Sequence, residues 1–90
     1  MSSKDNFVFE SSFIEGSLVA KLKVTASRKV TLYELAEALY DYYINLKDTT
    51  IFFDIEYYSC DGKMKYHLTN NAYWMNPATV LGDIAQQIKI

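Results

Sequence analysis

Apolar and polar residues alternate in four short stretches of the chain, which is the pattern of strands that bury one face. The stretches form two pairs, and each pair flanks a dipeptide that ends in glycine, Glu15-Gly16 or Asp61-Gly62. Such dipeptides are typical of two-residue hairpin turns, in which glycine takes a positive φ without steric cost. The pattern therefore predicts two β-hairpins.

A two-residue turn determines which residues lie opposite one another along a hairpin. In the second hairpin, the predicted pairs are Ser59 with Met64, Tyr57 with Tyr66, Ile55 with Leu68, Tyr58 with Lys65, Glu56 with His67 and Asp54 with Thr69. In the first hairpin, they are Phe9 with Leu22, Phe7 with Val24, Glu10 with Lys21 and Val8 with Lys23. This register gives each hairpin one apolar face and one charged face.

Each hairpin is followed by a stretch with helical spacing that opens on a capping residue. Thr31 and Glu34 have the spacing of a capping box, in which each side chain satisfies a free backbone amide. Asn76 is a good N-cap, and Pro77 suits the first position of a helix. The expected inner stripes are Leu32, Leu35, Ala36, Leu39, Tyr43 and Leu46 in the first helix and Val80, Leu81, Ile84 and Ile88 in the second.

The two halves of the chain, residues 7–46 and 51–90, share the order of a hairpin and then a helix. Their turns, alternation and caps coincide at an offset of 46 residues, which we interpret as an internal duplication. The predicted fold is α+β with the order ββαββα, a four-stranded, mostly antiparallel sheet and both helices on one face. It forms a single domain over residues 1–90. Gly82 is expected where the second helix closely approaches the sheet or the first helix.

The composition excludes several classes of protein. Half of the residues are apolar and 16% are aromatic, which excludes a disordered chain, while the spread of charged residues excludes a membrane span. The net charge of -2 does not suggest a general binder of polyanions. Cys60 is the single cysteine, and the first residues lack the apolar core of a signal peptide. We therefore expect a cytoplasmic, reducing location.

Few residues offer chemistry for catalysis or metal binding. The predicted register places His67 opposite Glu56, about 14 Å from Cys60, which separates the two residues of any cysteine–histidine site. Asp54 and Glu56 lie about 7 Å apart on one strand face, and we interpret them as solvated charges. The sequence contains no nucleotide-binding motif. We therefore predict a protein that is not an enzyme and that uses no cofactor or metal.

The first predicted helix carries an acidic ridge, which consists of Glu34, Glu37, Asp41 and Asp48. These residues fall within an arc of about 60°, opposite the leucine stripe. Repulsion between them costs a few tenths of a kcal/mol per pair, and no lysine on the ridge offsets it. The ridge is either a solvated helix face or a surface for a basic partner.

Aromatic residues border the acidic ridge. Tyr33, Tyr40 and Ile44 form a second apolar stripe on the helix, and tyrosine suits interfaces because it combines a large area with a polar tip. Tyr73 and Trp74 precede the last helix and could anchor a partner, although Trp74 could equally close the core. The predicted partner-binding residues are Tyr33, Glu34, Glu37, Tyr40, Asp41, Asp48, Tyr73 and Trp74.

These features predict a small protein that binds another protein with a basic surface, as an inhibitor or regulator. A concrete form is a phage or mobile-element anti-defence protein, similar in role to anti-CRISPR proteins, that blocks a basic nucleic-acid-binding cleft. One alternative, which we favour less, is a nucleic-acid-binding module that uses Tyr58 and lysines 21, 23, 63 and 65 on the sheet. Another is the subunit of a homo-oligomer, such as a homodimer, that buries its surplus tyrosines between copies.

Overall fold

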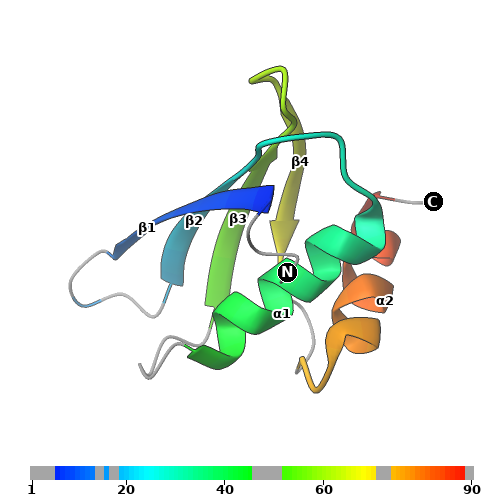
Figure 1. Cartoon of the computed structure of the whole chain (residues 1–90). Helices are drawn as coiled ribbons and strands as arrows, with labels where there is room; N and C mark the ends of the chain where they lie inside the picture. The colour runs from blue at the N-terminus through cyan, green and yellow to red at the C-terminus, as the bar shows by residue number, and fades with distance from the viewer. Residues whose placement is uncertain (1–5, 14–15, 17–18, 46–51, 71–73, 89–90) are drawn as a thin grey trace.

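The computed structural model describes residues 6–13, 16, 19–45, 52–70 and 74–88. Its elements, in chain order, are β1 (Phe7–Phe13), β2 (Val19–Ala26), α1 (Leu32–Asn45), β3 (Phe52–Tyr58), β4 (Met64–Thr69) and α2 (Pro77–Ile88). The four strands form one sheet in the order β1-β2-β3-β4, and Figure 1 shows both helices on the same side of it. The predicted α+β class and the ββαββα order are confirmed.

The direction of the central strand pair differs from the prediction. Each hairpin is antiparallel, but β2 and β3 run parallel, with Leu22 beside Ile55. The prediction of a mostly antiparallel sheet was therefore wrong, because the sheet is mixed. The physical reason is that α1 joins β2 to β3: the helix carries the chain back along the sheet, so both strands start at the same end.

The register of β3 and β4 confirms the prediction along most of the hairpin. The confirmed pairs are Asp54 with Thr69, Ile55 with Leu68, Glu56 with His67 and Tyr57 with Tyr66. Alternate residues of β3 point into the protein, so Ile55 and Tyr57 are buried. Two predicted pairs next to the turn were wrong: Tyr58 faces Met64 instead of Lys65, so Met64 does not lie opposite Ser59.

The turn of this hairpin explains the exception at Tyr58. The Ser59 amide donates a hydrogen bond to the Lys63 carbonyl at 3.0 Å, and the Gly62 amide donates one to the Ser59 carbonyl at 2.9 Å. The turn therefore contains three residues, 60–62, instead of the predicted two. Gly62 has a φ of 83°, which is typical of three-residue hairpin loops, and the irregular pairing beside Tyr58 accommodates the additional residue.

The register of β1 and β2 differs from the prediction by two residues. Phe9 lies opposite Val24 instead of Leu22. The other corrected pairs are Phe7 with Ala26, Val8 with Thr25 and Glu10 with Lys23. The described pairs end at Phe13 and Ala20, and Gly16 between them has a φ of 84°. Because the shift is even, it leaves each residue on its predicted face of the sheet.

The core lies between the helices and one face of the sheet. Its largest fully buried side chains are Leu35, Leu39, Ile55, Leu68, Ile84, Val24 and Val80. Complete burial of such a side chain contributes roughly 1.5–3 kcal/mol. Tyr43 extends the core along α1, because its ring centroid lies 6.1 Å from that of Phe53 and 5.4 Å from that of Trp74. Leu46, predicted for the same stripe, lies outside the described residues.

Both predicted helix starts are confirmed. The Thr31 amide donates to Oε1 of Glu34 at 3.0 Å, and the Glu34 amide donates to Oγ1 of Thr31 at 3.1 Å. Oδ1 of Asn76 accepts a 2.9 Å hydrogen bond from the amide of Thr79, and Pro77 is the first residue of α2. These caps satisfy amides that have no partner within their own helix.

The internal duplication of residues 7–46 and 51–90 stays a prediction. Both halves contain two strands followed by a helix, an order that does not by itself show that one half was copied from the other. One expectation drawn from the duplication was wrong. Gly82 does not mark a close approach, because it is exposed and no neighbouring element lies within 4 Å of the position that a Cβ would take.

Candidate functional site

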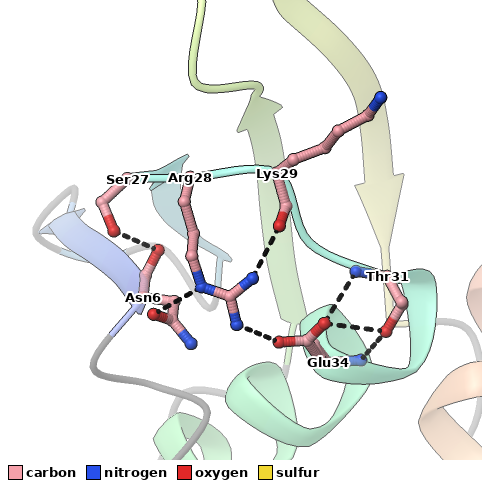
Figure 2. A network of polar contacts seen from close by, with 6 residues as sticks. All are labelled: Asn6, Ser27, Arg28, Lys29, Thr31 and Glu34. Carbon is pink, nitrogen blue, oxygen red and sulfur yellow. Dashed lines mark hydrogen bonds and ion pairs between the residues drawn. The ribbon is translucent and has the colours of Figure 1, made fainter.

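The acidic ridge begins in a polar network at the start of α1, which Figure 2 shows from close by. Oε2 of Glu34 accepts a 2.8 Å hydrogen bond from Nη2 of Arg28, in addition to the capping bonds with Thr31. Two further contacts fix the Arg28 guanidinium, at 3.0 Å to Oδ1 of Asn6 and at 2.7 Å to the Lys29 carbonyl. The Thr31 amide, aided by the Thr31 hydroxyl and by Arg28, lowers the pKa of the Glu34 carboxyl.

The Glu34 carboxylate is therefore already hydrogen-bonded to groups of the protein itself. Its two oxygens bind the helix start and Arg28, so a partner would have to compete with both. Arg28 could not be found from the helical spacing that defines the ridge, because it lies in the segment before α1. The remaining described acids of the ridge are Glu37 and Asp41.

Five residues of α1 form one continuous helix face, which we call the acid–tyrosine face: Tyr33, Glu37, Tyr40, Asp41 and Ile44. At 100° per residue, they fall within an arc of about 100°. Tyr33 is 49% exposed and Ile44 is 53% exposed, while the other three are partly exposed. The structure thus brings the predicted tyrosine stripe and the middle of the acidic ridge onto one surface.

Met75 extends the apolar part of this face. The Tyr40 hydroxyl donates a 2.9 Å hydrogen bond to the Met75 carbonyl, which joins α1 to the segment before α2. The Met75 side chain is 66% exposed. Met75 could not be assigned to this surface from the sequence, because only the fold shows that its segment lies beside α1.

Trp74 does not belong to the exposed surface. Its side chain is 2% exposed, and Nε1 donates a 2.9 Å hydrogen bond to Oδ2 of Asp83, which is also buried. The alternative in which Trp74 closes the core therefore applies, and we remove this residue from the candidate surface. Asp48 and Tyr73, which were predicted for the same surface, lie outside the described residues.

The sheet face opposite the helices carries charged residues of both signs. Nε2 of His67 contacts Oδ1 of Asp54, although the register places His67 opposite Glu56. Nζ of Lys23 lies 4.9 Å from the ring centroid of Tyr58. Within the described part of the chain, no three histidine, cysteine or carboxylate residues lie close enough together to hold a metal ion.

Comparison with known proteins gives no independent indication of function. No protein-family model, curated protein or solved structure matches the chain. Neither of the helices that the structure describes has the length and apolar character needed to cross a membrane. The function must therefore be inferred from the surface chemistry of this chain.

Proposed function

We propose that the protein is a non-enzymatic inhibitor or regulator that binds a basic surface of another protein through the acid–tyrosine face of α1. The observation that supports this function is the exposure of Tyr33 and Ile44 on the same helix face as Glu37 and Asp41. Exposed apolar side chains bordered by charges are typical of interaction surfaces. Met75 adds apolar area beside them.

The charge of α1 also favours a basic partner. The helix contains three acidic residues and no basic residue. Glu34 lies in the first turn, where the helix dipole stabilises an acid, but Glu37 and Asp41 lie beyond that turn. Attraction to a basic partner would speed association and make it sensitive to salt.

A nucleic-acid-binding cleft is the concrete partner surface that we propose. Such a cleft offers arginine and lysine side chains for Glu37 and Asp41 and flat apolar surfaces for the ring of Tyr33. An inhibitor in this cleft would exclude the nucleic acid by competition. The corresponding biological role is that of an anti-defence protein of a phage or mobile element, acting in the cytoplasm.

The experiment that tests this function compares three tagged proteins as baits for affinity capture and mass spectrometry. They are the unchanged protein, Glu37→Lys with Asp41→Lys, and a control with Lys21→Glu and Lys23→Glu on the opposite sheet face. We expect a nucleic-acid-binding partner that the unchanged protein and the control retain and that the α1 variant loses. Capture of the same partners by the α1 variant, with its fold intact by circular dichroism, would remove this face from the mechanism.

We favour the nucleic-acid-binding alternative less because the basic residues of the sheet do not form one continuous track. Lys21 and Lys23 line a hollow together with Glu10, Asp54 and Glu56. The remaining sheet lysines line a different hollow, near the β3–β4 turn. A single strand of nucleic acid needs a continuous basic groove with several stacking aromatic side chains.

A further inference from the structure

A hollow of about 420 Å³ lies between the turn that joins β3 to β4 and the segment that joins β2 to α1. Figure 1 shows the turn standing above this segment, although the two are far apart in the sequence. The basic residues of its lining are Arg28, Lys29, Lys63 and Lys65, and we call the site the cationic hollow. None of these residues belongs to the acid–tyrosine face.

Among the three lysines of the cationic hollow, Lys65 has an electrostatic interaction with Asp61. This interaction is the smallest cause of the lowered pKa of the Asp61 carboxyl, after its hydrogen bonds with the Ser59 hydroxyl and the Lys63 amide. Lys29, Lys63 and Lys65 are exposed, and within the described residues none of them forms an ion pair. Nζ of Lys65 lies 5.5 Å from the ring centroid of Tyr66, so its charge is held near the protein surface. Like charges that line one hollow repel one another, so this arrangement favours an anion there.

The acidic residue of the lining, Asp61, is turned toward its own hairpin. Its Oδ1 accepts a 3.0 Å hydrogen bond from the Lys63 amide and another from the Ser59 hydroxyl. These bonds hold the three-residue turn and thereby position Lys63. Arg28 is likewise occupied by Glu34, so the lysines supply the charge for a ligand.

The apolar part of the lining indicates the size and chemistry of the ligand. Val30 is half-buried and Met64 is 48% exposed, so both offer apolar surface beside the lysines. The volume lies within the usual range of roughly 300–1,000 Å³ for small-molecule sites. A phosphate monoester carries about -1.5 to -2 charges near neutral pH, which suits a hollow lined by several ammonium groups better than one carboxylate does.

We infer that the cationic hollow binds a small phosphorylated molecule of about the size of a nucleoside monophosphate. Its phosphate contacts Lys29, Lys63 and Lys65, and its remaining part lies against Val30 and Met64. A nucleic-acid polymer fits less well, because the next lysines along the sheet, Lys21 and Lys23, alternate with acids. This site is separate from the proposed protein-binding face and goes beyond the function proposed for that face.

The test is a titration of the ¹⁵N-labelled protein with adenosine 5′-monophosphate, followed by NMR. We expect saturable shifts of the amides of residues 28–30 and 59–65, weaker shifts of the same amides with inorganic phosphate, and none with adenosine. Lys63→Ala with Lys65→Ala should weaken binding at least about tenfold, since it removes two of the three ammonium groups that contact the phosphate. Lys29→Gln, on the other wall, should also weaken it.

Lys21→Ala with Lys23→Ala is the matched control, because it removes the same charge from the sheet outside the hollow. Its affinity for adenosine 5′-monophosphate should equal that of the unchanged protein. The inference would be overturned by the absence of saturable shifts in the hollow, by equal binding of adenosine, or by equal weakening by the control. An affinity that rises with the length of a single-stranded oligonucleotide would also overturn it and assign the hollow to nucleic acid.

Discussion

Nε1 of the Trp74 indole donates a 2.9 Å hydrogen bond to Oδ2 of Asp83, and both side chains are buried. A buried donor and a buried carboxylate therefore satisfy each other at the end of the core. Tyr43 packs against the same indole, with ring centroids 5.4 Å apart. This arrangement explains how the segment before α2 can carry a large aromatic residue without exposing it.

We predict that Asp83→Ala destabilises the protein by about 1–3 kcal/mol, because it leaves the indole N–H buried without its acceptor. Asp83→Asn should cost less, since the amide oxygen can still accept the hydrogen bond. The measurement is the free energy of unfolding in urea. Gln86→Ala, at an exposed position of α2, is the control and should stay within about 0.5 kcal/mol of the unchanged protein. Equal stability of Asp83→Ala and the control would contradict the role of this bond.

A second prediction concerns Gln87, which protects the outer edge of β4. Its Oε1 accepts a 2.7 Å hydrogen bond from the Thr69 amide, and its Nε2 donates a 2.6 Å bond to the Thr69 carbonyl. The side chain thus pairs with both backbone groups of an edge residue, as a further strand would. Gln87→Ala should lower the free energy of unfolding by about 1–2 kcal/mol.

Hydrogen exchange locates the effect of Gln87→Ala more directly than stability does. The Thr69 amide should lose protection, while amides in the middle of β2 should change only as much as global stability requires. Gln86→Ala again serves as the control, because it removes the neighbouring amide side chain without touching β4. Unchanged protection of Thr69 would show that Gln87 does not close this edge.

A third prediction follows from the exposed position of Gly82 in α2. No neighbouring element lies within 4 Å of a Cβ placed there, so alanine can be accommodated without a clash. Gly82→Ala should therefore stabilise the protein by about 0.5–1 kcal/mol, because alanine loses less backbone entropy in a helix. Thermal unfolding monitored by circular dichroism provides the measurement. A lower melting temperature would indicate that a Cβ at this position meets a close neighbour, as the duplication predicts.

Features that depend on neighbouring residues could be predicted from the sequence. The capping box of Thr31 and Glu34 and the N-cap at Asn76 satisfy amides within one turn, so their spacing is sufficient. The faces of the strands follow from alternation, which is why they survive the two-residue shift between β1 and β2. The length of the β3–β4 turn was predicted wrongly, because the same glycine can serve a turn of two or three residues.

Features that join distant parts of the chain could not be predicted. The parallel pairing of β2 with β3 depends on where α1 returns the chain, and local alternation contains no information about that pairing. The prediction of surface residues was limited for the same reason, because it depends on contacts between distant segments. Arg28 neutralises Glu34 from outside the helix, and Asp83 makes the burial of Trp74 favourable. The cationic hollow was missed because its lysines and Arg28 belong to different hairpin and loop segments.

The last prediction concerns pH. The Thr31 amide, with Arg28, lowers the pKa of Glu34, so the folded state binds a proton at this carboxyl more weakly than the unfolded state does. This stabilisation is fully present above the ordinary glutamate pKa and is lost as the pH falls through the lowered value. Arg28→Ala should raise the pKa of Glu34 only part of the way, because the Thr31 bond is the larger cause.

Carboxyl-detected NMR titration of Glu34 measures this pKa directly in each variant. Lys29→Ala is the matched control, because it removes the same charge one residue away and keeps the backbone carbonyl that Arg28 contacts. The control should leave the Glu34 titration close to that of the unchanged protein, whereas Arg28→Ala should move it upward. If both variants moved it equally, general charge rather than the Arg28 contact would set the pKa. The hydrogen bond from Arg28 would then have no specific effect on the Glu34 carboxyl.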